Sequence, residues 1–336
     1  MAGVRLYYEE FPVKKHKKGS SGKTAHADVY QMVTDRIVAA LEQGTAPWRR
    51  PWQSAGQVCT GGLPSNALTG RCYSGVNVLL LWMAAVDGGY ASNLWLTYRQ
   101  AQEAGGQVRK GETGSLAVIY KDWTKPAEDE HGNRLYDTDG NPLKETVPML
   151  RQLSLFNVAQ CDGLPALMQP DDGTGRPGED YAVVSPERLA DVKTMLEATG
   201  VEMEPRLQDR AYYTPVMDRI VMPLTSQFDS EADYWSTLLH EMVHSTGHRK
   251  RLDREGISAP HKKGDDAYAM EELIAETGSA FLCAQLGIYG EVQHDSYIDG
   301  WLRVLKADKK ALFRACSKAR EASEYLLAPL SIRSAA

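Results

Sequence analysis

Two histidines spaced four residues apart carry the clearest chemical signal in the sequence. His240 and His244 enclose the motif His-Glu-Met-Val-His, with Glu241 directly after the first histidine. Residues at i and i+4 lie on the same face of a helix, so both imidazoles can bind one metal ion. Glu241 is placed to take a proton from a water molecule that the ion has acidified. The motif therefore predicts a catalytic metal site with Glu241 as the general base.

A third protein ligand must come from another segment. The longer metallopeptidase pattern requires a histidine where this chain has Lys250. The acidic run Met270–Glu276 offers carboxylates within a mostly apolar helix, where an unpaired charge would be costly. We expect Glu272 to be the ligand and Glu276 to accept a hydrogen bond from a ligand histidine; Glu271 is the alternative ligand. Two histidines, one glutamate and an open position are typical of a catalytic zinc site.

Two helices are predicted to hold these side chains. One runs over Ser230–Gly247 and the other over Tyr268–Gly287, and both contain apolar residues at helical spacing. The segment Tyr212–Pro223 is predicted to form a hairpin, which is either an ordinary hairpin or an edge strand along which an extended peptide pairs. Further helices are predicted over 185–199 and Tyr297–Leu327.

The first half of the chain combines aromatic and basic side chains in loop-like segments. Bases stack on aromatic rings and phosphates pair with Arg and Lys, so this mixture suits single-stranded DNA. The alternative, that these aromatic side chains belong to the core, stays open for the set and is expected for Trp82 and Trp95. The candidate DNA-binding residues are Trp48, Arg49, Trp52, Arg71, Tyr73, Arg109 and Lys110.

Helices and strands alternate irregularly in this half. The predicted elements are helices over Ala27–Gln43, Val76–Ala85 and Tyr98–Ala104 and strands over Ser115–Tyr120 and Arg151–Val158. Between the two strands, Thr124–Pro148 is polar and rich in turn residues, which predicts an inserted hairpin or loop.

Composition limits the class of protein. The 336 residues are 43% hydrophobic and 24% charged, values typical of globular chains, and this length predicts two domains. No apolar run approaches the roughly 20 residues that span a bilayer, and the first residues lack the apolar segment of a secretory signal. Five cysteines without a CxxC pair argue against a disulfide framework. We therefore expect a reduced, cytoplasmic protein that does not bind membranes.

Charge is distributed unevenly along the chain. Residues 1–166 carry 18 basic and 16 acidic side chains, whereas the remainder carries 20 and 28. This asymmetry predicts two domains with different tasks, one of them facing a polyanion. We divide the chain into a flexible basic arm (1–24), an α+β domain that binds single-stranded DNA (25–167) with an acidic insert (122–147), a linker (168–184) and a mainly helical metal-binding domain with a small β-sheet (185–336).

Both halves resemble, in order, the ArdC-type antirestriction proteins of conjugative plasmids. In the first half the resemblance covers about 29–164 and rests on Pro47-Trp48, Pro64-Ser65-Asn66, Tyr73–Asn77, Trp95-Leu96-Thr97, Gly105–Glu112 and Phe156-Asn157-Val158. In the second half it covers about 211–328 and rests on Tyr213-Thr214-Pro215, Asp218-Arg219-Ile220, His240–His248, Arg251-Leu252 and Glu271–Glu276. The lysine-rich arm and the acidic insert depart from the family's pattern.

The resemblance implies an N-terminal domain that binds single-stranded DNA and a zincin-like metallopeptidase domain with Glu272 at the third-ligand position. It implies Zn²⁺, or another divalent transition metal such as Mn²⁺, and an unknown protein or peptide substrate. The expected function is protection of incoming single-stranded plasmid DNA from host restriction during conjugation. Two alternatives remain: a DNA-associated metalloprotease for repair or regulator cleavage, and a non-catalytic shield that binds single-stranded DNA.

Overall fold

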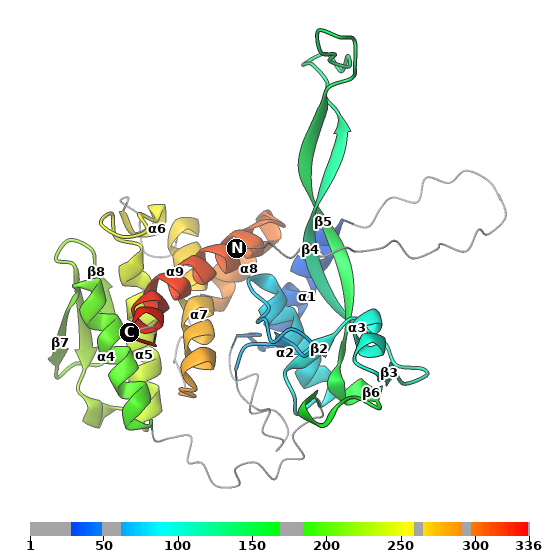
Figure 1. Cartoon of the computed structure of the whole chain (residues 1–336). Coiled ribbons are helices and arrows are strands. Elements are labelled where there is room, and N and C mark those ends of the chain that lie inside the picture. Colours follow the sequence, from blue (N-terminus) through cyan, green and yellow to red (C-terminus); the bar gives the residue numbers. More distant parts are fainter. Residues whose placement is uncertain (1–27, 49–61, 169–183, 259–264, 291–296, 335–336) are drawn as a thin grey trace.

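The structure, a computed structural model, describes residues 28–48, 62–168, 184–258, 265–290 and 297–334. It confirms the predicted α+β class, with sheets mainly in the first half and helices dominating the second (Figure 1). The predicted basic arm and most of the predicted linker lie outside the described residues. Arg49 and Trp52 also lie outside them.

The first half is built around a mixed sheet. Strand β2 pairs in parallel with β1 and antiparallel with β5, which in turn pairs antiparallel with β4. A second small sheet pairs β3 with β6. The elements are α1 (Val29–Glu42), β1 (Ser65–Asn66), α2 (Val76–Gly88), β2 (Leu94–Leu96), α3 (Tyr98–Glu103), β3 (Gln107–Val108), β4 (Ser115–Pro126), β5 (Lys144–Asn157) and β6 (Cys161–Asp162).

The second half places a three-stranded sheet beside a group of helices. Strand β9 lies in the middle, parallel to β7 and antiparallel to β8. The elements are α4 (Pro186–Thr199), β7 (Glu202–Arg206), β8 (Tyr212–Thr214), β9 (Arg219–Pro223), α5 (Glu231–Thr246), α6 (Glu255–Ser258), α7 (Asp266–Leu286), α8 (Ile298–Ala307) and α9 (Ala311–Ser334). The single last helix expected from the sequence is two helices, because Asp308 adopts an extended conformation and accepts a hydrogen bond from the Lys310 amide at 2.8 Å.

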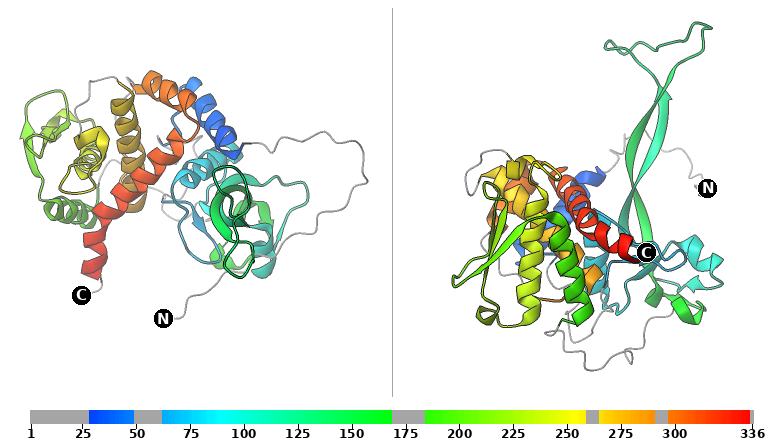
Figure 2. Two further views of the ribbon diagram at one scale, coloured as in Figure 1. Left: turned by 90° about the horizontal axis from the view of Figure 1, so that it is seen from above. Right: turned by 60° about the vertical axis from the view of Figure 1, so that its left-hand side comes forward.

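Strands β4 and β5 form a long ribbon that projects away from the rest of the molecule (Figures 1 and 2). The strands pair without interruption from Ser115 opposite Leu155 to Pro126 opposite Lys144. The hairpin expected over 124–148 is therefore present, but its strands begin in the body of the sheet. Its base is buried through Ala117 and Val118, whereas the side chains beyond Val118 are mostly exposed.

One hydrophobic core joins the two halves. Trp48, which follows α1, packs edge to face against Trp301 of α8 with ring centroids 5.2 Å apart. Trp82 of α2 contacts Phe281 of α7 with centroids 6.1 Å apart. The Thr34 hydroxyl donates a hydrogen bond to the Lys309 carbonyl at 2.9 Å. Residues of both halves thus belong to a single buried cluster.

Candidate metal centre

Helix α5 presents His240 and His244 on one face. The helix begins after Ser230, whose Oγ accepts a hydrogen bond from the Asp233 amide at 3.1 Å, as an N-cap residue does. The two imidazole rings meet edge to face, and their Nε2 atoms lie 3.1 Å apart. Because the two histidines are one helical turn apart, both Nε2 atoms are close enough to bind one metal ion.

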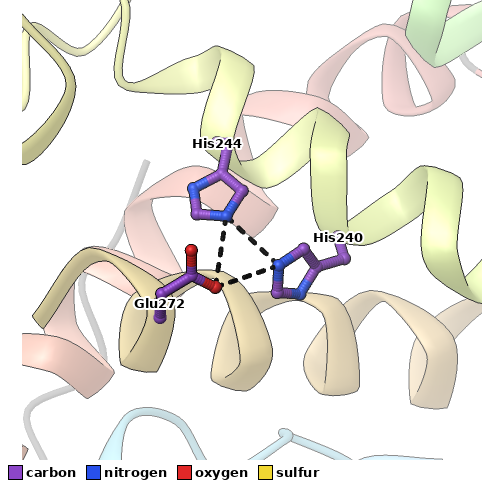
Figure 3. A group of neighbouring side chains, drawn as sticks. All are labelled: His240, His244 and Glu272. Carbon is purple, nitrogen blue, oxygen red and sulfur yellow. Dashed lines mark hydrogen bonds and ion pairs between the residues drawn. The ribbon is translucent and has the colours of Figure 1, made fainter. Parts of the chain in front are cut away.

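Helix α7 crosses α5 closely enough to add a carboxylate. A Cβ at Gly278 would lie 3.0 Å from a Val243 methyl group, so glycine permits this close approach. Glu272 Oε2 lies 3.5 Å from His240 Nε2 and 3.7 Å from His244 Nε2 (Figure 3). In the part of the chain that the structure describes, these three buried side chains are the group that converges as possible metal ligands.

The spacing of the three donor atoms fits a tetrahedral metal ion. With metal–ligand bonds of about 2.1 Å, the donors of a tetrahedral site lie about 3.4 Å apart. The observed separations of 3.1, 3.5 and 3.7 Å bracket that value. Two imidazoles and a carboxylate also match the donor types that zinc-class ions accept. The side chains therefore fit a divalent transition metal and leave one coordination position for water.

The charges at the site also favour a cation. Burial raises the pKa of Glu272, but the neighbouring His244 and His240 lower it by more, so the carboxyl group stays ionised. Burial lowers the pKa of His244, but Glu272 and Glu271 raise it well above its usual value. A proton and a metal ion thus compete for the same imidazole, so binding of the metal releases protons.

Glu271 lies behind His244 rather than among the donors. Its Oε1 is 3.2 Å from His244 Nδ1, the ring nitrogen opposite the one that faces Glu272. Arg254 donates to both Glu271 oxygens, at 3.0 and 2.6 Å, and to the Val243 carbonyl at 2.7 Å. Burial raises the pKa of Glu271, but Arg254 and His244 lower it by more. The carboxylate can therefore fix the orientation of the His244 ring.

The three converging donors are those expected from the sequence, with Glu272 rather than the alternative Glu271 among them. The contact of Glu271 with His244 was not expected, and the expected contact of Glu276 with a ligand histidine stays a prediction. Glu276 is buried on α7, one turn beyond Glu272. Arg254 was missed, although a buried glutamate implies a cationic partner and this arginine follows the metal-binding helix. Gly247 leaves room for it, since a Cβ there would lie 3.0 Å from an Arg254 guanidinium nitrogen.

Glu241 directly follows His240 on α5 and is not one of the three converging donors. It is buried on α5, and its charge contributes to the raised pKa of both His244 and Tyr297. A carboxylate that adjoins the donors without binding the ion can accept a proton from a water molecule in the open position. The position of Glu241 is therefore suited to a general base.

Two tyrosines border the site and had no clear sequence signal. The hydroxyl groups of Tyr268, one turn before Glu272 on α7, and Tyr297, directly before α8, lie 2.9 Å apart. Burial, and then the charge of Glu272, raise the pKa of both tyrosines. Both phenols therefore stay protonated and can donate hydrogen bonds at the site.

The structure is incompatible with a base-stacking role for Trp48. Its side chain is only 2% exposed, because Trp301 and the shared core cover it. A ring without an exposed face cannot stack on a base. The sequence-based assignment of Trp48 to the DNA-binding set is therefore wrong, and this tryptophan belongs to the core.

The other candidate DNA-binding residues that the structure describes lie on two different loops. Arg71 and Tyr73 follow β1; Arg71 is exposed, whereas Tyr73 is half-buried and its hydroxyl accepts a hydrogen bond from Asn66 at 3.3 Å. Arg109 and Lys110 follow β3, and both are exposed. Arg109 donates to Glu112 and to the Ala159 carbonyl, each at 2.7 Å, so intramolecular partners occupy its guanidinium.

Comparisons with known proteins match both halves. Residues 27–156 match the family model of the N-terminal domain of the anti-restriction factor ArdC, and residues 190–318 match that of a zincin-like metallopeptidase. The crystal structure of the antirestriction ArdC protein from plasmid R388 is 39% identical in sequence, in a metal-free form (TM-score 0.72; 91% of this chain and 98% of that one) and in an Mn(II)-bound form (TM-score 0.68; 90% and 98%).

Curated relatives extend over nearly the same length of this chain. An uncharacterised protein, y4eC, of Sinorhizobium fredii is 36% identical over 90% of this chain and 93% of its own length. A DNA primase TraC of Escherichia coli is 36% identical over 89% of this chain, which spans only 27% of that longer protein. Within the described residues, no helix is both long enough and apolar enough to cross a membrane.

Proposed function

Since the chain belongs to the family of ArdC-type antirestriction proteins, we propose that it protects incoming plasmid DNA from host restriction during conjugation. In this proposal the first half binds single-stranded DNA in the recipient cytoplasm, and the second half is a metal-dependent peptidase. This chain is similar to a segment of a protein named DNA primase TraC. That similarity supports a function that involves plasmid DNA. The target of the peptidase is an unidentified protein or peptide.

The convergence of three buried donors beside an intact glutamate carries the enzymatic part of the proposal. A bound divalent ion would acidify a water molecule and polarise a peptide carbonyl. His240, His244 and Glu272 would hold it, and Glu271 would orient His244. Glu241 takes the proton of the attacking water and delivers it to the leaving amine. Zn²⁺ suits this donor set, and the Mn(II)-bound relative supports Mn²⁺ as an alternative.

The test separates DNA protection from proteolysis. Plasmid transfer into a restricting recipient would be measured with the wild-type protein, with Glu241→Gln and with the double variant His240→Ala/His244→Ala, and extracts of that host would be screened for metal-dependent cleavage. We expect Glu241→Gln to keep the metal and lose hydrolysis. Protection lost in both variants supports a catalytic function, whereas full protection by both supports the non-catalytic shield. A wild-type protein that does not protect the plasmid contradicts the antirestriction function itself.

A further inference from the structure

The projecting ribbon of β4 and β5 carries two exposed aromatic side chains. Twelve residue pairs extend it to roughly 40 Å. Trp123 is 43% exposed and Tyr120 is 56% exposed. A two-stranded ribbon with both faces in water has no core to bury such groups.

The cross-strand register assigns the side chains to two different faces. Residues that pair across the strands point to the same side, and successive pairs alternate between the sides. One side, which we name the basic-aromatic face, consists of four pairs: Ile119 with Arg151, Lys121 with Met149, Trp123 with Val147, and Lys125 with Glu145. Its three cations and one carboxylate sum to a formal charge of +2. Trp123 lies between the two lysines of its strand.

Two of the cations on the basic-aromatic face are available to a partner. Lys125 forms an ion pair with Glu145 at 2.6 Å. Lys121 and Arg151 are exposed, and neither forms an ion pair with any other described residue. On this face Lys121 lies one pair from Trp123 along the same strand, and Arg151 lies two pairs away on the other strand, so an aromatic ring and two unneutralised cations share one surface.

The opposite face and the tip of the ribbon have different properties. On the opposite face, Tyr120 is tied to Tyr30 of α1 through hydroxyl groups 3.2 Å apart, and Thr124 lies opposite Thr146. The tip, residues 127–143, holds five acidic side chains and one arginine, a formal charge of −4. The ribbon as a whole therefore combines a basic face on its shaft with an acidic tip.

We propose that the basic-aromatic face binds single-stranded DNA, with Trp123 stacked on a base and Lys121 and Arg151 at phosphates. Stacking rings beside backbone cations are the combination that single strands require. Repulsion by the acidic tip confines the strand to the shaft. Because the ribbon has a right-handed twist, its basic-aromatic face winds around the long axis of the ribbon. A flexible single strand of DNA can follow this winding. This inference rests on the proposed DNA-binding function and assigns it to a surface.

The experiment measures affinity of the full-length protein for fluorescent oligothymidylate at several salt concentrations. Trp123→Ala is expected to weaken binding about 5- to 150-fold, the effect of losing one stacked base, and Trp123→Phe is expected to restore most of it. Lys121→Ala/Arg151→Ala is expected to lower the slope of log K against log salt by about 1.4, since each phosphate contact contributes about 0.7. Duplex of equal length should bind more weakly than the single strand.

Matched variants on the same ribbon serve as controls. Tyr136→Ala removes a 57% exposed ring from the acidic tip, and Thr124→Ala/Thr146→Ala alters the opposite face; neither is expected to change the affinity. If the wild-type protein binds oligothymidylate and all ribbon variants bind it equally well, the ribbon proposal is overturned while DNA binding stands. That result would also be expected of a ribbon that binds a protein. A wild-type protein that binds no single strand overturns both proposals.

Discussion

At the scale of single residues, the metal centre depends on which ring nitrogen of each histidine faces which glutamate. His240 and His244 direct Nε2 towards Glu272, and His244 directs Nδ1 towards Glu271. Arg254 neutralises Glu271 where burial alone would favour a neutral acid. Arg254, which is not among the three donors, thus holds the carboxylate that contacts His244.

Adjacent glutamates on α7 are expected to respond differently to substitution. Glu272→Ala removes one of three protein ligands and should reduce metal affinity far more than Glu271→Ala, which loses only an orienting contact worth about 10- to 100-fold. Affinity would be measured by competition with a chromophoric chelator. Glu241→Gln is the control, since this residue is not among the donors and its replacement should leave the affinity unchanged. A larger loss in Glu271→Ala than in Glu272→Ala would contradict the ligand assignment.

At the scale of elements, a buried arginine ties the small sheet to the end of the metal-binding helix. Arg251 donates to the Ser245 carbonyl at 2.7 Å and pairs with Asp218 in the turn between β8 and β9. Tyr213 of β8 donates to the same carboxylate at 2.8 Å. Burial raises the pKa of Asp218, but Arg251 and Tyr213 lower it by more, to about 2.

Asp218→Asn is expected to destabilise the protein in a pH-dependent manner. The folded-state pKa lies below the unfolded value, so the ion pair stabilises the fold at neutral pH and this contribution is lost as pH falls from about 4 towards about 2. The free energy of unfolding should fall by up to about 2 kcal/mol at pH 7, and the difference from wild type should shrink in acid. Asparagine tolerates the positive φ of 49° at this position. Urea titrations of both proteins across this pH range give the difference directly, and a gap independent of pH would refute the assignment.

At the scale of the whole molecule, the two halves share one core instead of being joined only through a linker. Trp48, Trp301, Tyr297 and Tyr268 form successive ring contacts that lead from the first half to the metal centre. Separation of the halves would expose two tryptophans that are at most 2% accessible. Experiments on DNA binding therefore require the full chain.

Trp48→Ala is expected to destabilise both halves together. Truncation of a buried tryptophan typically costs about 3–5 kcal/mol. Because the core is shared, the loss of helical signal and the release of bound metal should move to lower temperature by the same amount. Trp123→Ala, which removes an exposed tryptophan, is the control and should leave the melting temperature unchanged. Early melting of the first half with metal release at the wild-type temperature would show that the halves unfold independently.

The local features of this protein follow from its sequence alone. The spacing of His240 and His244, the caps and apolar periodicity of α5 and α7, and the turn-rich hairpin depend on interactions between neighbours in the chain. Such interactions act over one or two helical turns or across one hairpin. They place the metal-binding motif on a helix and indicate a second helix rich in carboxylates.

The assignments that only the tertiary structure decided depend on contacts between distant residues. Trp48 is a core residue because Trp301, 253 positions later, covers its ring. Glu271 contacts His244 because the crossing of α5 and α7 sets which side of α7 faces the histidine. The charges of the β4–β5 ribbon separate into a basic face and an acidic tip only once the strand register is known. A buried and an exposed tryptophan, or a ligand and a neighbouring glutamate, have the same residue type and the same local spacing. The sequence pattern therefore cannot distinguish them, whereas the packing of remote elements does.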